Sequence, residues 1–558
     1  MTTRAAPEVV RFERIDVRPP PGIVSRALTT NRHLLGLMFG GLAAWTRDQA
    51  ARGRGHDARY LLAKLVSAVT RPFIRRDLAS LPFAVQFRRR LELLGPTYIK
   101  LGQILSLRED ILPHSITSEL RGLLNRLPAV SFEVFCALVE EDLGRPLERL
   151  YSWVDPEPLG SASIAQIHRA TTLLGDDVVI KAVKPGVAET LRRDARLLRV
   201  LGAALQLVIP RYQPRRIITE FCEYTAREVD LRREADNADT FAANFRDLHD
   251  VVFPTIDRDR SGARVLTMQY LDGLRPDSPE AVALPEEDRQ RLVDLGAESI
   301  IRMLYRDGFF HADLHPGNLL VLRGKGRRPR VGFIDLGMVG RFDNDLRRAL
   351  LYYYYSLVTG DADNAARYLA AVAEPGRAGD PAGFRREVRE ISARWQRAST
   401  FDTFSLAQLV LESVAQGAQF RMYFPVELVL MVKALVTFEG VGHVLVPDFD
   451  VAEVSRRHIR RVFLEQFSPF RIVREELRGA PDLIDALVKL PSLVTEGVRV
   501  LERSARPPAE HPLSGLRGTL LAGFCLVAGA ILLVFGGAWP VWGSLFAAAL
   551  ILGFRSGG

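Results

Sequence analysis

The sequence contains the stretch His311-Ala312-Asp313-Leu314-His315-Pro316-Gly317-Asn318, which holds two histidines, an aspartate and an asparagine. The stretch Phe333-Ile334-Asp335-Leu336-Gly337 lies further along, and the apolar segments 319–322 and 331–334 predict a pair of strands between the two aspartates. The loop and the end of this hairpin therefore carry an Asp, an Asn and a further Asp. Such hard oxygen ligands suit Mg²⁺ that is bound to nucleotide phosphates.

Zinc is the alternative that the two histidines raise. His311, Asp313 and His315 alternate along a loop, without a His-Glu-x-x-His helix and without a cysteine nearby, so a zinc site is disfavoured. The three cysteines are too scattered to form a metal-ligand pair or a disulfide framework, which fits a reducing compartment. They are Cys136, Cys222 and Cys525.

Upstream of these loops, small residues lead into a segment that is predicted to be a strand with a lysine in it. The small residues are Gly160, Ser161, Ala162 and Ser163. Residues 178–183 are β-branched around Lys181, and the turn at 175–177 predicts a β-hairpin. Small residues let backbone N–H groups approach phosphate oxygens, and a strand lysine can reach the same phosphates. A plain hairpin with an edge lysine remains the alternative.

A helix predicted over 219–241 offers a partner for this lysine. Asp230, Glu234 and Asn237 follow the spacing i, i+4, i+7 and would share one face of that helix. We expect Glu234 to pair with Lys181, although a surface carboxylate is the simpler reading of any single glutamate.

A second helix is predicted to begin at Thr97, after Gly95-Pro96. Lys100 and Gln103 share one of its faces, whereas the apolar residues Leu101, Ile104 and Leu105 occupy another. Gly102 is unfavourable within a helix and is expected where another element approaches closely. Alone, a lysine and a glutamine on one face are most often solvated.

The C-terminal segment 519–554 contains no charged residue. As one helix it would measure about 54 Å, against about 30 Å for the hydrocarbon core of a bilayer. Two glycines and a proline at 536–540 predict a transmembrane hairpin instead, with arms over 519–535 and 541–554. Arg517 and Arg555 would keep both ends in the cytoplasm. A buried core hairpin is the alternative.

The N-terminal part does not resemble a secretory signal peptide, because no continuous apolar region occurs within residues 1–31. Its apolar run 34–45 is too short to span a bilayer and predicts a buried or interfacial helix. Over all 558 residues the hydrophobic fraction is 47% and the charged fraction 25%, which excludes wholesale disorder and collagen-like repeats. The net charge of +9 is compatible with anionic lipid, nucleotide or nucleic acid, and selects none of them.

Asp313 with Asn318 five residues later, followed by Asp335-Leu336-Gly337, resembles the catalytic and metal-binding loops of protein kinases. The catalytic loop reads His-Ala-Asp where kinases commonly have His-Arg-Asp, and the small-residue loop lacks the Gly-x-Gly-x-x-Gly pattern. The element Lys100-Leu101-Gly102-Gln103 also precedes the kinase-like part. Together these motifs are similar to those of the UbiB family of atypical kinase-like proteins, over residues 90–350.

The resemblance implies ATP and Mg²⁺ as cofactors. It implies that Lys181 and Glu234 form the ion pair that positions the phosphates, and that Asp313 is the catalytic aspartate. By the same resemblance, the Mg²⁺ ligands are Asn318 and Asp335. The implied nucleotide-binding residues are Gly160, Ser161, Ala162 and Ser163 of the loop, and Met268 and Tyr270 of the strand and hinge. The implied cover over the site consists of Lys100 and Gln103, facing Glu228 and Asp230.

The resulting fold class is α+β: a bilobal protein-kinase-like fold with a helical N-terminal extension and a C-terminal transmembrane hairpin. The expected parts are a variable region (1–90), the extension (91–150), an N-lobe (151–273), a helical C-lobe (274–505) and the hairpin (515–555). Gly160 stands where many relatives have a run of alanines, so the nucleotide preference is expected to differ.

The resemblance implies an ATPase or phosphotransferase that supports isoprenoid-quinone biosynthesis at the bacterial inner membrane, with the kinase-like domain in the cytoplasm. The expected partners are membrane lipids or isoprenoid-quinone intermediates and other proteins of that biosynthesis, but no nucleic acid; a homo-oligomer is compatible with the sequence. A nucleotide-dependent regulatory scaffold is the alternative. An ordinary protein kinase is disfavoured, because no Ala-Pro-Glu segment follows Asp335.

Overall fold

The computed structural model divides into two units, Met1–Gln466 and Phe467–Gly558. In the first unit it describes residues 22–466 except for short gaps; in the second it describes only residues 544, 546 and 547. The gaps are 52–59, 62–63, 66, 68–77, 79–80, 107, 109–111, 124–128, 163, 209–212, 323–327, 377, 398–405 and 450. Apart from residues 544, 546 and 547, the arms of the predicted hairpin, 519–535 and 541–554, therefore lie outside the described residues, as does the loop residue Ser163.

A five-stranded antiparallel sheet forms the N-lobe, with the order β1-β3-β4-β6 and β2 paired to β3. Its strands are β1 (Tyr151–Val154), β2 (Gly160–Ser161), β3 (Ala165–Thr172), β4 (Asp177–Val183) and β6 (Val265–Gln269). The predicted hairpin is confirmed as β3 and β4, in which Ile167 faces Lys181. β4 is buried on both faces: Ile180 packs with Phe135 of α7 (Phe132–Leu143), and Val179 packs with Ala235 of α10 (Leu231–Asn244).

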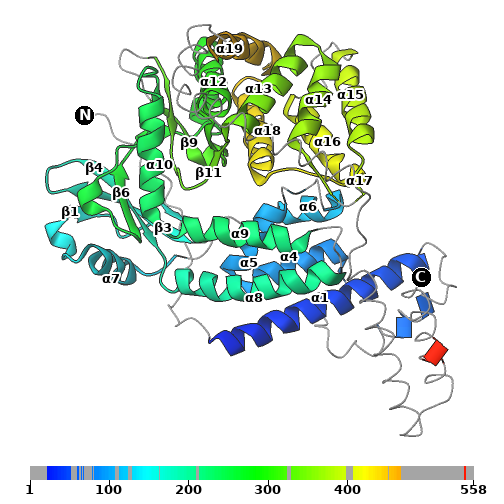
Figure 1. Ribbon diagram of the computed structural model, residues 1–558. Helices are drawn as coiled ribbons and strands as arrows, with labels where there is room; N and C mark the ends of the chain where they lie inside the picture. Colours follow the sequence, from blue (N-terminus) through cyan, green and yellow to red (C-terminus); the bar gives the residue numbers. More distant parts are fainter. Residues whose placement is uncertain are drawn as a thin grey trace, which may run out of the picture. The chain divides into compact units, whose positions relative to one another are not determined.

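Helices below this sheet form a bundle that includes the N-terminal extension, and in it α1, α4, α5, α8 and α9 run side by side (Figure 1). They are α1 (Ile23–Ala51), α4 (Phe83–Leu94), α5 (Pro96–Leu105), α6 (His114–Leu120), α8 (Val187–Val208) and α9 (Pro214–Glu228). The predicted helix at Thr97 is α5, and a Cβ atom at Gly102 would lie 2.3 Å from the side chain of Leu123. The close approach of another element, which a glycine within a helix predicted, is therefore confirmed at Gly102.

The apolar run 34–45 belongs to α1, which packs on α4 and α8. Arg26 fixes the start of α1, because its guanidinium donates to the buried carboxylate of Asp194 at 2.7 Å and to the Leu94 carbonyl at 2.6 Å. This part of the chain is thus held within the extension.

The prediction of a single helix over 219–241 is wrong, because α9 ends at Glu228 and α10 begins at Leu231. The side chain of Asp230 accepts a hydrogen bond from the Arg232 N–H and so caps the start of α10. Aspartate is strongly preferred at this position, because its oxygen satisfies an N–H that has no partner within the helix.

The C-lobe combines short strands with a helical body. A four-stranded sheet has the order β5-β10-β9-β7, and β8 pairs with β11. The strands are β5 (Val251–Val252), β7 (Gly273–Leu274), β8 (Phe309–His311), β9 (Leu319–Leu322), β10 (Arg330–Phe333) and β11 (Val339–Arg341). The pairing of β9 with β10 confirms the hairpin predicted between the two aspartates.

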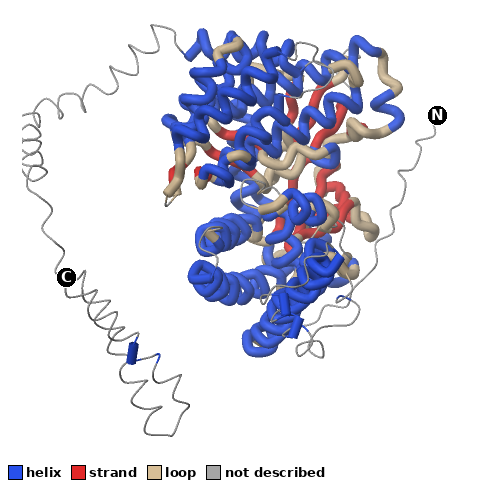
Figure 2. The backbone as a smooth tube through the Cα atoms, turned by 90° about the vertical axis from the view of Figure 1, so that its right-hand side faces the viewer, coloured by secondary structure: helices blue, strands red, loops and turns tan. Residues whose placement is uncertain are grey.

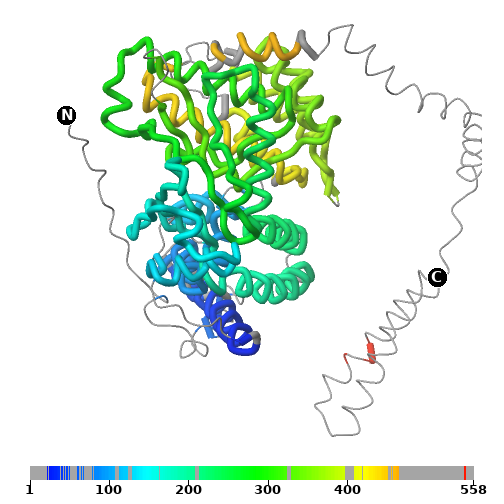
Figure 3. The backbone as a smooth tube through the Cα atoms, turned by 90° about the vertical axis from the view of Figure 1, so that its left-hand side faces the viewer, coloured from blue at the N-terminus to red at the C-terminus, as the bar shows by residue number. Residues whose placement is uncertain are grey.

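The helices of this lobe cover its strands (Figure 2). They are α12 (Glu286–Ile301), α13 (Asn344–Thr359), α14 (Ala362–Val372), α15 (Pro381–Arg397), α16 (Leu406–Ala415), α18 (Val426–Leu445) and α19 (Val451–Gln466). Short elements complete it: α11 (Pro279–Val282), α17 (Gly417–Phe420), β12 (Glu374–Pro375) and β13 (Met422–Tyr423). The colouring in Figure 3 shows the early segments gathered in the extension and N-lobe, and the later ones in the C-lobe.

α18 is the one described helix that is long and apolar enough to cross a membrane. Its most apolar window is 61% buried within the protein, and the helix packs on α12 and α16. In this structure α18 is therefore a core helix of the C-lobe.

Candidate active site

Lys181 lies at the centre of the site, on β4. Its Nζ atom is 2.8 Å from Oε1 of Glu234 on α10 and 2.8 Å from Oδ1 of Asp335. Burial alone would lower the pKa of Lys181, but the charges of Asp335 and Glu234 outweigh it and raise this pKa. Burial raises the pKa of Glu234 to about 7 despite the neighbouring lysine. The expected Lys181–Glu234 ion pair thus forms, and Asp335 joins it.

α10 connects this ion pair to the loop that carries Asp335. The Asn237 amide on the same helix donates to the Leu336 carbonyl at 2.9 Å. Asp335 itself adopts a left-handed backbone conformation, with φ of 55°, which turns the chain sharply after β10. Burial would raise the pKa of Asp335, but the charge of Lys181 holds it well below its usual range.

The loop after β8 positions Asp313 through its own backbone. The Asp313 N–H donates to Nδ1 of His311 at 3.1 Å, so the His311 proton resides on Nε2, which lies 3.3 Å from the Ile334 carbonyl. Burial lowers the pKa of His311 and keeps this ring neutral. Asn318 donates its amide nitrogen to the Asp313 carbonyl at 3.0 Å, which leaves its amide oxygen as a ligand for a cation.

These donors fit Mg²⁺. Asn318 offers an amide oxygen, and Asp335 offers a second carboxylate oxygen beyond the one that Lys181 holds. Among the described residues no group of three or more His, Cys, Asp or Glu side chains converges on one metal position. Mg²⁺ bound to nucleotide phosphates takes only one or two protein carboxylates, whereas an all-protein metal site would need more ligands.

Lys433 is a site residue that the sequence did not reveal. It lies on α18, and its Nζ atom contacts Oδ1 of Asp313 at 2.7 Å. Burial would raise the pKa of Asp313, but Lys433 and His315 lower it, so this carboxylate is ionised at neutral pH. The only signal in the sequence is a single lysine in the middle of an apolar helix, which implies a partner because an unpaired buried charge is costly.

The extension reaches the same site through α5. Lys100 Nζ contacts Oε1 of Glu228 at 2.8 Å, and Gln103 lines a cavity together with Asp313. Burial would lower the pKa of Lys100, but Glu228 raises it, with contributions from Asp313 and Asp335. The structure thus brings Lys100, Gln103 and Glu228 beside the catalytic loop.

Asp230 does not join this cover. The prediction placed it there by stacking it on Glu234 within one helix, and the break between α9 and α10 removes that stacking. Asp230 instead pairs with Arg232 at 2.8 Å on the surface.

The small-residue loop starts as strand β2, where Gly160 pairs with Ile167. Lys184 donates to the Ala162 carbonyl at 2.7 Å and fixes the position of this loop. Met268 is buried in β6. The Tyr270 N–H donates to the Asp177 carbonyl at 3.0 Å. A backbone contact of Tyr270 with the adenine base of a nucleotide would therefore have to use the Tyr270 carbonyl. The small-residue loop thus lies beside the end of β4, the strand that carries Lys181, whereas Met268 and Tyr270 lie beside its start.

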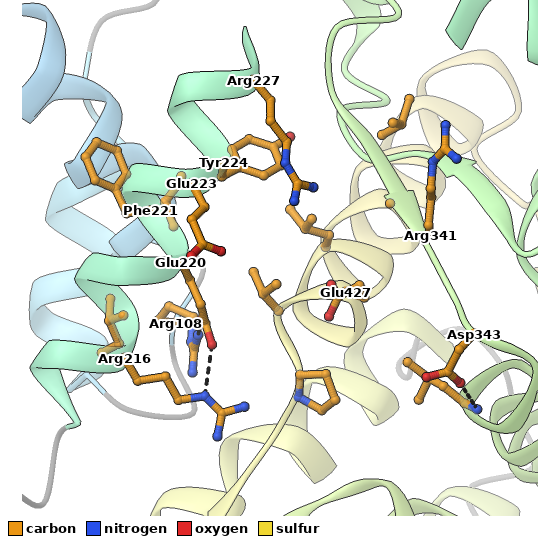
Figure 4. Close-up of a pocket in the computed structure, with 18 of the residues that line it drawn as sticks. Arg108, Arg216, Glu220, Phe221, Glu223, Tyr224, Arg227, Arg341, Asp343 and Glu427 are labelled. Atoms are coloured by element: carbon orange, nitrogen blue, oxygen red, sulfur yellow. Dashed lines mark hydrogen bonds and ion pairs between the residues drawn. The ribbon is translucent and has the colours of Figure 1, made fainter. Parts of the chain in front are cut away.

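Another cavity, of about 1160 Å³, lies elsewhere among the described residues. Figure 4 shows its charged lining: α9 contributes Glu220, Glu223 and Arg227, with Arg341 and Asp343 opposite. The ion pair Arg216–Glu220 spans 2.9 Å on its α9 side. Its described lining residues include none of Lys181, Asp313, Asn318 and Asp335, so its size does not make it the catalytic centre.

Comparisons with known proteins agree with this geometry. The profile of the ABC1 atypical kinase-like domain matches residues 122–369, and that of the UbiB helical domain matches residues 397–450. A protein named "Probable protein kinase UbiB" from Pseudomonas entomophila is 30% identical, over 86% of this chain and 90% of its own length. Its namesake from Azotobacter vinelandii is 30% identical, over 83% of this chain and 87% of its own.

Two further similarities were found. An uncharacterized Synechocystis protein, sll1770, is 31% identical over 75% of this chain and 72% of its own length. A solved structure described as a complex of Rv3197 with erythromycin, from Mycobacterium tuberculosis, is 22% identical with a TM-score of 0.44, covering 74% of this chain and 100% of that one. From the two matching profiles and the relatives that align over most of their length, the chain belongs to the UbiB family and contains an ABC1 atypical kinase-like domain.

Proposed function

We propose that this protein is a membrane-anchored atypical kinase or ATPase that uses Mg-ATP. The observation that carries the proposal is the position of Lys181, whose Nζ atom lies 2.8 Å from both Glu234 and Asp335. A strand lysine paired with a helix glutamate, next to a metal-binding aspartate, is the arrangement with which kinases position nucleotide phosphates.

Each of the site residues has a definite task in this proposal. Lys181 offsets phosphate charge, and Glu234 together with α10 holds the lysine in place. Asn318 and Asp335 would hold Mg²⁺, which offsets the negative charge that develops on the phosphates. Asp313, ionised beside Lys433, orients the attacking hydroxyl or water and accepts its proton.

The biological setting in this proposal is isoprenoid-quinone biosynthesis at the bacterial inner membrane. Two relatives at 30% identity carry the name UbiB, which supports this assignment. The uncharged segment 519–554 supports anchoring in the bilayer, with the catalytic part in the cytoplasm. The corresponding partners are membrane lipids, quinone intermediates and other proteins of that biosynthesis.

A regulatory scaffold that uses nucleotide only as a conformational ligand is the second candidate. It is favoured by the fact that both functional aspartates already have a lysine partner: Asp313 is paired with Lys433, and Asp335 with Lys181. In a scaffold these ion pairs would fix one conformation and would not serve catalysis.

Phosphate release separates the two candidates. The full-length chain in lipid nanodiscs should release inorganic phosphate from Mg-ATP, and release should stop when EDTA removes the metal or when Asp313 is replaced by Asn. Nucleotide binding without phosphate release, and without labelled phosphate on any lipid, would favour the scaffold. Absence of Mg-ATP binding would overturn both.

A further inference from the structure

A second cavity, of about 510 Å³, opens beside Asp313. Its polar lining residues are Lys100, Gln103, Ser106, Arg121, Asp313, His315, Gln408, Lys433 and Thr437. Its apolar lining residues are Ile104, Leu120, Leu123, Met338, Leu411, Val414, Ala415, Val429, Val432 and Val436. The cavity therefore joins the catalytic aspartate to an apolar wall within one space.

The apolar wall follows from the periodicity of α18. Val429, Val432 and Val436 occur at the spacing of a single helix face, and Lys433 lies on that same face. The helix thus presents one charge, paired with Asp313, between valines one turn to either side. α16 adds Leu411, and the extension closes the cavity from another direction.

We propose that this cavity receives the phosphoryl acceptor, and that the acceptor is a hydroxyl-bearing amphiphile. The inference rests on the phosphotransferase form of the proposed function. Asp313 is the one carboxylate among the described lining residues, so an acceptor hydroxyl has one anionic side chain to which it can pass its proton. The apolar part of the acceptor lies along the valines of α18.

The bonds that form and break in phosphoryl transfer involve only the acceptor, ATP and a side chain that lines the cavity. The acceptor oxygen forms a bond to the γ-phosphorus of ATP while the bond from that phosphorus to the bridging oxygen breaks, and ADP leaves. The hydroxyl proton passes to the Asp313 carboxylate. Lys433 and Lys100, which also line the cavity, offset the charge on the phosphoryl group during transfer.

The walls argue against a peptide acceptor. An extended chain would bring backbone N–H and C=O groups against valine and leucine side chains that cannot hydrogen-bond, and each buried group left unpaired weakens binding. An alkyl chain carries no such groups and gains from leaving water. The volume also lies within the range of roughly 300–1000 Å³ that is usual for small-molecule sites.

Photolabelling of the full-length chain tests the proposal. The probe is a twelve-carbon primary alcohol with a diazirine in its chain, and the matched probe is its methyl ether. The alcohol should label peptides of α16 and α18 several times more strongly than the ether. Val436→Phe and Leu411→Phe, which fill the cavity, should reduce this labelling at least about fivefold.

Leu435→Phe is the matched control, because Leu435 is half-buried on the same helix but does not line the cavity. Its labelling should equal that of the wild type. Equal labelling by both probes, or labelling that the cavity-filling variants leave unchanged, would overturn the acceptor site. Mg-ATP binding by the wild type is measured in the same samples: its absence would refute the proposed function, whereas its presence without cavity labelling would refute this inference alone.

Discussion

Lys433 Nζ and Asp313 Oδ1 lie 2.7 Å apart although 120 residues separate them in the chain. One belongs to the stretch matched by the UbiB helical domain, the other to the ABC1 kinase-like domain. The charge state of Asp313, the proposed catalytic aspartate, therefore depends on a helix outside residues 122–369, which match the ABC1 domain.

Replacing Lys433 by Met should raise the pKa of Asp313, because the nearest cation that lowers it is lost. The acidic limb of the pH–rate profile for phosphate release should then move to higher pH, so that the rate on this limb falls relative to the wild type while the rate at higher pH changes less. Lys433→Arg keeps the charge and should restore most of the wild-type profile. Superimposable profiles of Lys433→Met and the wild type would show that the ion pair does not control Asp313.

Asp335→Asn should weaken Mg-ATP binding, because it removes a negative charge that offsets the divalent cation. Glu234→Gln should have a smaller effect, since Lys181 keeps Asp335 as a partner and can still reach phosphate. Thermal-shift titrations with Mg-ATP measure both. Equal shifts for Asp335→Asn and the wild type would remove the metal role of Asp335.

Lys100→Ala should change the rate of phosphate release or the nucleotide preference more than it changes folding. The Lys100–Glu228 pair is largely buried, with side chains 17% and 11% exposed, and Lys100 also interacts electrostatically with Asp313 and Asp335, so its loss changes the charge beside the proposed catalytic residues. Arg89→Ala is the control, because the Arg89–Glu92 pair has a half-exposed arginine and is worth at most about 1 kcal/mol. If Lys100→Ala leaves binding and hydrolysis of Mg-ATP unchanged, α5 does not act as a cover.

Stability should depend on Lys184 between pH 8 and 10.5. Burial lowers the pKa of Lys184 from 10.5 to about 8, so in this window the unfolded chain binds more protons at this position than the folded one. The contribution of Lys184 to the free energy of unfolding therefore rises with pH from about 8 to about 10.5. Urea unfolding across this window should show a smaller rise for Lys184→Met than for the wild type. Identical slopes would contradict the assignment.

Removal of residues 515–558 should release the chain into the soluble fraction, because 519–554 is the predicted transmembrane hairpin. α18 should not retain it, since that helix is mostly buried in the C-lobe. Carbonate extraction followed by immunoblotting compares the two forms. If carbonate already strips the full-length chain from membranes, the hairpin does not span the bilayer.

Features encoded by adjacent residues could be predicted from the sequence. The β3–β4 and β9–β10 hairpins follow from strand runs and turn residues. The Lys181–Glu234 pair joins residues 53 apart in the chain, and its prediction rested on the resemblance to kinases and on the polar face of the predicted helix. The error at Asp230 arose because helical periodicity continues across the boundary between α9 and α10. A capping residue can stand at helical spacing from residues of the helix that follows it, so residue spacing alone does not reveal the break between two helices.

Lys433 could not be predicted, for a different reason. Its contact joins α18 to a loop 120 residues earlier, and no local pattern encodes a pairing that distant. The cavity beside it is equally non-local, since its lining comes from α5, α6, α16, α18 and the catalytic loop.

The ion pair between α18 and the catalytic loop also limits how the protein can be divided. A fragment that ends at residue 369, where the match to the ABC1 domain stops, would contain Lys181, Asp313 and Asp335 but would lack the lysine that holds Asp313 ionised. Such a fragment could bind nucleotide and still misreport the acidity of the catalytic aspartate. The smallest piece with an intact charge balance at Asp313 therefore extends through α18, to residue 445.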